Sequence, residues 1–332
     1  MLPTPPSRVA VVIPSYRVSR HVLGVIAGIG PDVERIYVVD DRCPEDSGGI
    51  VESTCTDPRV RVIRHRENGG VGAAVVTGYR AAIDEGLDIV VKVDGDGQMD
   101  PSLIPQFIAP IARGEVDYTK GNRFWDLTHI QRMPWVRRFG NLGLSFLAKA
   151  STGYWDLFDP TNGYTALSVP VAARLPLDGL SRRYFFETDV LFRLNTLRAA
   201  VADVPMDARY GDESSSLSVR RVLFEFAFKH ARNLGKRIFY NYFLRDLSIA
   251  SLELLAAVTL LAFALVFGGL HWWHSIQTGV SASVGTVMIA ALSAISGLQF
   301  LLAFLGYDIA AVPKRAVHPL LPTRGLASSV KD

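Results

Sequence analysis

The sequence predicts an α/β fold with a mostly parallel sheet, followed by two transmembrane helices. Two observations lead to this prediction. Short Val- and Ile-rich runs alternate with helix-like stretches through the first third of the chain, and a long uncharged stretch lies near the C-terminus. Near-continuous apolar strands separated by helices are typical of a parallel sheet that is covered on both faces.

Each expected strand has a compact β-branched core of strand length, and the intervening stretches have helical patterns. The strands are expected at 8–14, 35–41, 59–65 and 88–94. The helices are expected at 18–29, 46–56, 70–85 and 101–113. Asp100 directly precedes Pro101 and is expected to cap the last of these helices.

The uncharged stretch runs from Leu254 to Tyr307, and its 54 residues include no Asp, Glu, Lys or Arg. A membrane-spanning helix needs about 20 apolar residues. The stretch therefore holds two, expected at 247–269 and 282–306. The alternative is a pair of buried helices in a soluble domain.

Charge at the flanks predicts the orientation of these helices. Seven bases and one acid lie between Arg220 and Arg245, further bases follow the second helix, and the loop with Trp272 and Trp273 has no Lys or Arg. The positive-inside rule then places both termini in the cytoplasm. The expected segments are a cytoplasmic domain at 1–217, a basic amphipathic helix on the anionic leaflet at 218–245, two spans within 246–307 and a cytoplasmic tail at 308–332. For 218–245 the alternatives are an ordinary solvated basic face and an RNA-binding patch.

Composition excludes several classes. The net charge of +3 is too small to argue for nucleic acid, and no secretory signal is evident at the N-terminus. Cys43 and Cys55 have no CxxC or Cys/His cluster near them, which favours free thiols in a reducing compartment over a disulfide. No P-loop motif occurs, and the glycines at 69–72 do not complete a dinucleotide fingerprint.

Polar residues follow the four expected strands, as in Pro14-Ser15-Tyr16, Asp40-Asp41, Glu67-Asn68-Gly69-Gly70 and Asp94-Gly95-Asp96. In open α/β sheets ligands bind beyond the carboxyl ends of the strands. These four strand ends therefore predict a nucleotide-sized site.

The stretch "VDGDGQMDP" provides the metal candidates. Asp94 and Asp96 lie two apart after a strand, and with the amide oxygen of Gln98 they form a set of hard ligands suited to Mg²⁺ or Mn²⁺. A plain Asp-Gly turn is the alternative. A calcium loop is excluded, because Met99 and Pro105 stand where such a loop needs Gly and Glu.

Several motifs in this order carry a family resemblance: "VVIPSYR", "VVDD", "ENGGVGAAVVTGYRAA", "VDGDGQMDP", "KGNRF", "RRFGNLGLSFLAKASTGYWDLFDPTNGY" and "YFFETDVLFRL". Together they resemble the GT-A, family 2 glycosyltransferases, specifically the dolichol-phosphate mannose synthase branch and its bacterial polyprenyl-phosphate relatives. The resemblance covers about 8–235, and the two C-terminal helices are similar to the anchor of the bacterial subgroup.

The resemblance implies a role for each matching residue. Nucleotide-sugar binding falls to Pro14, Tyr16, Asp40, Asp41, Asp94 and Arg123. The metal ligands are Asp96, Gln98 and Asp94. Catalytic roles near the sugar or the acceptor fall to Asp96, Asp159, Glu187 and Asp189. Phosphate or acceptor contacts fall to Arg123, Arg137 and Arg209. For Asp159 and Asp189 a helix cap or a surface charge is the alternative.

Two positions depart from the family pattern. Arg17 stands where the family often has Glu after the first strand, and Glu213-Ser214-Ser215 replaces Glu-Ser-Lys, so that a basic contact is missing. Both departures leave the nucleotide and the details of phosphate contact open.

The resemblance implies a metal-dependent, inverting transfer of a hexose from a UDP- or GDP-sugar to a polyprenyl phosphate at the cytoplasmic leaflet of the cell (inner) membrane, with Mg²⁺ or Mn²⁺. The same resemblance is compatible with a homo-oligomer such as a tetramer, and nucleic acid is not expected as a partner. Two alternatives stay open: a processive or other family 2 lipid or polysaccharide synthase, and an inactive membrane-anchored nucleotide-sugar-binding protein.

Overall fold

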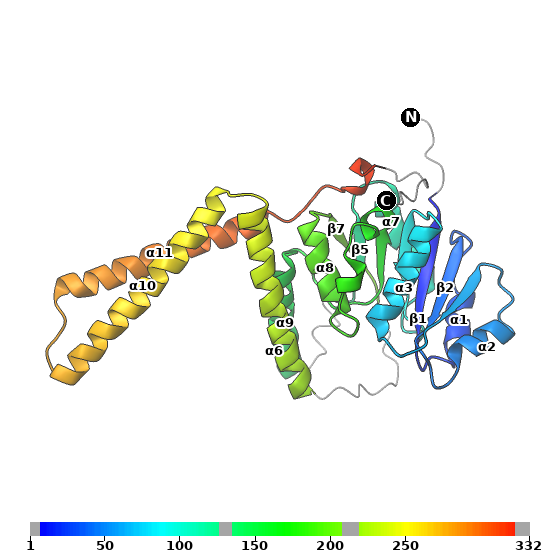
Figure 1. The fold of residues 1–332 in the computed structure, drawn as a ribbon, viewed down its shortest axis with the longest axis horizontal. Coiled ribbons are helices and arrows are strands. Elements are labelled where there is room, and N and C mark those ends of the chain that lie inside the picture. The colour runs from blue at the N-terminus through cyan, green and yellow to red at the C-terminus, as the bar shows by residue number, and fades with distance from the viewer. Residues whose placement is uncertain (1–6, 126–134, 208–218, 323–332) are drawn as a thin grey trace, which may run out of the picture. The chain divides into compact units, whose positions relative to one another are not determined.

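The computed structural model describes residues 7–125, 135–207 and 219–322, and of 135–141 and 219–224 it describes the backbone alone. The chain divides into two compact units (Figure 1). One runs to Leu234 and resumes at Pro313, and the other is Gly235–Val312.

Within the described residues, seven strands form one sheet in the order β3-β2-β1-β4-β6-β5-β7. The strands are β1 (Val9–Ser15), β2 (Arg35–Asp40), β3 (Val60–Arg64), β4 (Ile89–Lys92), β5 (Tyr118–Asn122), β6 (Thr165–Ser168) and β7 (Val201–Pro205). All neighbouring pairs are parallel except those of β6, which runs antiparallel to β4 and β5. The four strands expected from sequence and their parallel pairing are confirmed.

The helices of this unit are α1 (Val22–Ala27), α2 (Ser47–Thr54), α3 (Val71–Asp84), α4 (Ile104–Ala112), α6 (Trp135–Thr152), α7 (Val169–Ala172) and α8 (Phe186–Thr196). Short turns lie at η1 (Pro101–Leu103), η2 (Leu177–Gly179) and η4 (His318–Leu320). Asp100 caps η1, because its carboxylate accepts a hydrogen bond from the amide of Ser102 at 3.0 Å. The predicted cap is thereby confirmed.

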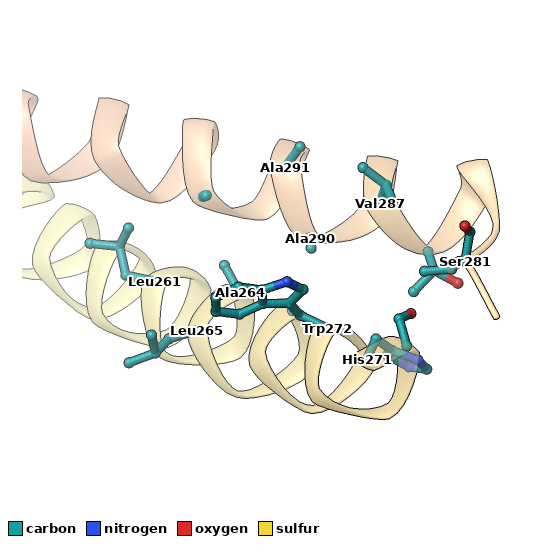
Figure 2. Close-up of a pocket in the computed structure, with 14 residues that line it drawn as sticks. Leu261, Ala264, Leu265, His271, Trp272, Ser281, Val287, Ala290 and Ala291 are labelled. Carbon is teal, nitrogen blue, oxygen red and sulfur yellow. The ribbon is translucent and has the colours of Figure 1, made fainter. Parts of the chain in front are cut away.

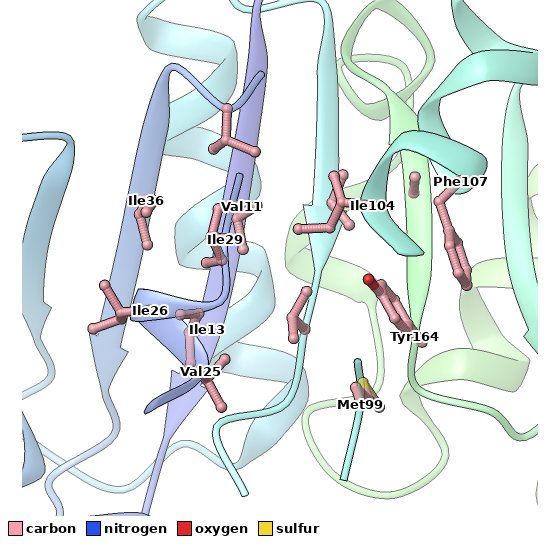
Figure 3. Close-up of a cluster of buried hydrophobic side chains, with 14 of the residues drawn as sticks. Val11, Ile13, Val25, Ile26, Ile29, Ile36, Met99, Ile104, Phe107 and Tyr164 are labelled. Atoms are coloured by element: carbon pink, nitrogen blue, oxygen red, sulfur yellow. The ribbon is translucent and has the colours of Figure 1, made fainter. Parts of the chain in front are cut away.

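Alternation along β1 explains how the sheet is covered on both faces, since successive strand side chains point to opposite sides. Val11 and Ile13 join a buried cluster with residues of α1 and α4, in which Phe107 stacks on Tyr164 at 4.0 Å between ring centroids (Figure 3). Val12 faces α3 on the other side, so closely that a Cβ at Gly78 would lie 2.4 Å from it.

Helix α9 (Val219–Phe239) begins in the first unit, and a π-helical turn, η3 (Tyr240–Leu244), follows it. In the first unit, Nδ1 of His230 in α9 forms a 2.7 Å hydrogen bond with the hydroxyl of Ser151 in α6. The ring of Phe185 packs edge-on against the His230 ring. His230 is buried, and this burial lowers its pKa to about 4. Within the expected segment 218–245, the structure has α-helix over Val219–Phe239 and a wider π-helical turn over Tyr240–Leu244, and the location of this segment at a membrane stays a prediction.

The second unit contains α10 (Ile249–Thr278) and α11 (Val284–Ala310), both long and apolar enough to cross a membrane. Only 17% and 11% of their most apolar windows are buried within the chain, which argues against the alternative of core helices in a soluble domain. The prediction placed Trp272 and Trp273 in a loop, and this was wrong: α10 continues through both, because no Pro or Gly interrupts 270–278.

The two helices of the second unit pack closely in one place and part in another. A Cβ at Gly297 would lie 2.9 Å from Leu261, so the absence of a side chain there allows close approach. Toward the connecting loop an apolar groove of about 920 Å³ opens between them, with Ala264 and Ala290 among its lining residues (Figure 2).

A buried ion pair lies in the second unit. Arg237 donates to both carboxylate oxygens of Asp308, at 2.6 and 2.9 Å, and the hydroxyl of Tyr242 donates to the same carboxylate at 2.5 Å. Both charged residues are almost fully buried. The pair therefore ties the end of α9 to the end of α11.

Candidate active site

A polar cleft of about 960 Å³ lies at the carboxyl ends of the parallel strands. Residues that follow β1, β2, β4 and β5 line it together with the start of α8. Its lining includes the predicted site residues Pro14, Tyr16, Asp41, Asp94, Asp96, Gln98, Arg123 and Glu187. The polar strand ends that are far apart in the sequence thus meet at one edge of the sheet.

The turn after β4 presents Asp94, Asp96 and Gln98 to the cleft. It is tightly built: the amide of Gln98 donates to Asp96 Oδ1 at 3.0 Å, and Gly97 has a φ of +78°. Within the described residues, no three His, Cys, Asp or Glu side chains form a metal cluster. The turn offers carboxylate and amide oxygens alone, a set that fits a cation completed by water and phosphate oxygens.

A buried lysine, Lys92, underlies this turn. Its ammonium, 1% exposed, lies 2.7 Å from Asp94 Oδ1 and 3.3 Å from Glu187 Oε1, and it donates to the carbonyl of Gly163 at 3.0 Å. Burial alone lowers the pKa of Lys92, but the carboxylates of Asp94 and Glu187 outweigh it and hold that pKa above its ordinary value. Lys92 was not singled out from the sequence. A lysine inside the apolar run "IVVKVD" nevertheless indicates a buried charge that needs acidic partners.

The Asp41 carboxylate holds the glycine turn before α3. It accepts hydrogen bonds from the amides of Gly69 and Gly70 at 2.8 and 2.7 Å, and His65 Nδ1 lies 2.7 Å from it. Gly70 has a φ of +88°, and a Cβ there would lie 2.5 Å from the carbonyl oxygen of Arg182. A glycine is therefore required at this strand-to-helix turn.

Asp40, predicted beside Asp41 as a nucleotide contact, does not line the cleft. Its carboxylate accepts hydrogen bonds from the amides of Cys43 and Gly48 at 2.7 and 2.9 Å, and it is buried. Neighbouring side chains at a strand end point to opposite faces, so only one of the two acids faces the cleft. Cys43 and Cys55 are free thiols, as expected.

Arg123 and Asp159 form a two-point ion pair. Arg123 Nε donates to Asp159 Oδ2 at 2.7 Å, and Nη2 donates to Oδ1 at 3.1 Å. Asp159 is 1% exposed and does not line the cleft, whereas Arg123 lines it. This geometry lets Asp159 orient the Arg123 guanidinium, and the catalytic role near the acceptor that the resemblance implied for Asp159 stays a prediction.

Glu187 and Asp189 lie two residues apart in the first turn of α8, and the structure separates them. Two helical positions differ by about 200° around the axis. Glu187 faces the cleft, while the carboxylate of Asp189 accepts hydrogen bonds from the amide of Ser181 at 2.9 Å and from Arg193 at 3.4 Å. Asp189 is buried and does not line the cleft, so its contacts brace the base of α8, and the catalytic role expected for it stays a prediction.

The remaining residues of interest around the cleft are mainly arginines. Arg209 lies outside the described residues, and of Arg137 only the backbone is described. Arg17, which departs from the family pattern, lines the cleft with a φ of +58°, and its guanidinium lies 5.5 Å from the Tyr16 ring centroid. Sequence reasoning missed Arg183 and Tyr184, which also line the cleft and directly precede the acidic motif of α8.

Comparison with known sequences identifies a family. Residues 10–175, half of the chain, match the family described as glycosyl transferase family 2. Among curated relatives, a UDP-N-acetylglucosamine–dolichyl-phosphate N-acetylglucosaminyltransferase of Methanococcus voltae is 27% identical over 61% of this chain and 86% of its own length. An undecaprenyl-phosphate mannosyltransferase of Micrococcus luteus is 27% identical over 60% of this chain and 82% of its own.

Comparison with solved structures supports the fold. Glucosyl-3-phosphoglycerate synthase from Mycobacterium tuberculosis, crystallised with Mn²⁺, UDP and phosphoglyceric acid, has a TM-score of 0.52 at 19% identity and covers 70% of this chain and 78% of its own. Mannosyl-3-phosphoglycerate synthase from Rubrobacter xylanophilus has a TM-score of 0.51 at 19% identity, with 73% and 77% covered. The first unit therefore has the GT-A fold that the sequence resemblance implied.

Proposed function

The chain belongs to glycosyltransferase family 2, and from this premise we propose that it transfers a hexose from a nucleotide-diphosphate sugar to a polyprenyl phosphate. One observation carries the proposal: a single chain holds both an acid-lined cleft at the sheet edge and two apolar helices of spanning length. The donor is soluble and the acceptor tail stays in the bilayer, so the enzyme needs both parts. Two relatives are named for transfer to dolichyl or undecaprenyl phosphate.

Asp96 and Gln98, with Asp94 beside them, would hold Mg²⁺ or Mn²⁺. The metal would neutralise charge that develops on the departing diphosphate. Asp96 lines the cleft beside Gln98, and it is the acid of this turn that we assign as the main ligand. The nucleobase and ribose would lie toward Pro14, Tyr16 and Asp41.

The acceptor phosphate is already an anionic nucleophile, and so the reaction needs no strong general base. In-line attack at the anomeric carbon would invert its configuration. Catalysis then depends on holding the two substrates in line and on stabilising negative charge. Arg123 lines the cleft and is held there by Asp159, and we assign it as the side chain that contacts a substrate phosphate.

The charge pattern supports a membrane topology with both termini in the cytoplasm. In this arrangement the first unit works at the cytoplasmic leaflet, residues 218–245 lie along it, and the boundaries at 217, 245 and 307 stay predictions.

Purified full-length protein, incubated with polyprenyl phosphate, Mn²⁺ or Mg²⁺ and a panel of UDP- and GDP-hexoses, tests the proposal. We expect one glycosyl-phosphoryl-polyprenol, detected by its mass. Products with several sugars per lipid would indicate a processive synthase. Nucleotide binding without any lipid product would indicate the inactive binding protein.

A further inference from the structure

Two lysines are buried in the middle of the sheet, on either side of one strand. Lys92 of β4 and Lys120 of β5 both pair with Thr165 of β6, the strand between them. Directly opposed residues of neighbouring strands project on the same face. Lys92 is 1% exposed and Lys120 0% exposed. Burying ammonium groups is costly, so such a pair calls for compensating partners.

The partners of both lysines include backbone carbonyls of one turn. Lys92 donates to the carbonyl of Gly163, and Lys120 donates to the carbonyl of Asn162. Residues Thr161 to Gly163, which we call the 161–163 turn, line the cleft. A Cβ at Gly163 would lie 2.6 Å from Lys92 Nζ, so the turn is pressed directly against the ammonium.

This turn leads to the arginine at the cleft wall. The Thr161 hydroxyl donates to Asp159 at 3.3 Å, and the Asn162 side-chain amide donates to the same carboxylate at 3.4 Å. Asp159 in turn holds Arg123. A displacement of the turn would therefore reach the guanidinium through a continuous series of polar contacts.

Lys120 differs from Lys92 in its charge balance. The charged groups that act on it are Glu187 of α8, Asp159, Asp203 of β7, Lys92 of β4 and Arg123 at the end of β5. Burial is the main influence, and although Glu187 and Asp159 oppose it, the pKa of Lys120 is lowered to about 8. Lys120 therefore changes charge within a range in which an enzyme can be assayed.

We propose that Lys120, with Lys92 beside it, is a positioning residue for sugar transfer, and that its protonated form holds the 161–163 turn and Arg123 in their working places. This inference rests on the proposed function. Protonation strengthens the hydrogen bond to the Asn162 carbonyl, because a charged donor binds more strongly than a neutral one. Loss of the proton above about pH 8 should loosen the turn and slow the reaction.

The test compares the full-length wild type with Lys120→Met, which keeps length and removes charge, and with the exposed control Lys314→Met. Rates are measured between about pH 6.5 and 9.5 with the active donor and polyprenyl phosphate. We expect wild type and control to lose activity with a midpoint near pH 8. Lys120→Met should show kcat about 10- to 100-fold lower at neutral pH, a KM for the donor within about threefold, and no such alkaline fall.

Hydrogen–deuterium exchange of the same proteins gives a readout that needs no activity. The peptide covering residues 159–165 should exchange faster in Lys120→Met than in wild type, while the peptide of β2 should not change. If the wild type transfers no sugar at any pH, the proposed function fails. The exchange measurement then tests by itself whether Lys120 holds the 161–163 turn in place.

Three results would overturn the inference: a wild-type rate in Lys120→Met, an unchanged alkaline fall in that variant, or unchanged exchange at 159–165. Should Lys120→Met fail to fold, Lys120→Arg replaces it. Arginine stays protonated, so the alkaline fall should then move above about pH 9, and an unmoved midpoint contradicts the inference.

Discussion

Replacing Asp159 and Arg123 singly and together distinguishes a positioning acid from one that acts on the substrate. If Asp159 works only by holding Arg123, the double variant Asp159→Asn/Arg123→Met should be no slower than Arg123→Met alone. If Asp159 acts on the substrate by itself, the two losses should multiply.

The size of the effect follows from the contact geometry. Two charge-assisted hydrogen bonds, at 2.7 and 3.1 Å, join the pair. Such bonds contribute about 1.5–3 kcal/mol each when desolvated. The Arg123 side chain is 36% exposed, so solvent screening reduces the total, and we expect a coupling energy of about 2 kcal/mol. That energy corresponds to about 30-fold in kcat/KM.

The assay measures kcat/KM for transfer to polyprenyl phosphate with the donor found by the panel. We expect about a 30-fold loss in each single variant and no further loss in the double variant. A loss in the double variant near the product of the single losses, about 1,000-fold, would refute the positioning role.

Unfolding midpoints provide an independent check on the same pair. Arg123→Met leaves a carboxylate that is 1% exposed without its charged partner, which costs about 3–5 kcal/mol. Asp159→Asn leaves a guanidinium that reaches water, and so it should destabilise the protein less. The opposite order of midpoints would contradict this account of burial.

Three further outcomes are expected. Asp96→Asn should abolish metal-dependent transfer and leave membrane insertion and the unfolding midpoint unchanged. Near-normal turnover in this variant would contradict the assignment of Asp96 as a metal ligand. Asp41→Ala should lower the unfolding midpoint, because the amides of Gly69 and Gly70 lose their acceptor. Both amides are only partly buried, so each loss should cost less than the about 1–3 kcal/mol of a fully buried donor. An unchanged midpoint would count against this account. Burial lowers the pKa of His230 from its ordinary 6.5 to about 4, so in that window the unfolded chain binds a proton that the folded chain does not. Stability should therefore fall as pH drops from 6.5 toward 4, and His230→Gln should remove part of that fall in a thermal melt series.

Local patterns were enough to predict much of the fold and part of the site. The Val- and Ile-rich runs predicted the four N-terminal strands, since a buried parallel strand needs an apolar side chain at nearly every position. The acids after β4 and the polar turn after β1 reach the cleft because the carboxyl ends of parallel strands share an edge. The uncharged stretch near the C-terminus predicted two long helices by composition alone.

The same patterns were insufficient where the direction of a side chain decides its role. Asp40 and Asp41 are adjacent, and only Asp41 faces the cleft, while Glu187 and Asp189 share a helical turn and only Glu187 does. A sequence states that an acid is near a site, but the rotation of its strand or helix against the sheet decides which way it points.

The sequence by itself determined the first four strands with the helices between them, the acidic turn after β4 and the apolar helices, because each depends on residues close together along the chain. The tertiary structure alone decided that Lys92 and Lys120 flank Thr165, and that both reach the 161–163 turn. These residues come from β4, β5 and the loop before β6. Only the register between strands that are distant in sequence brings their charges together, and no local pattern encodes that register.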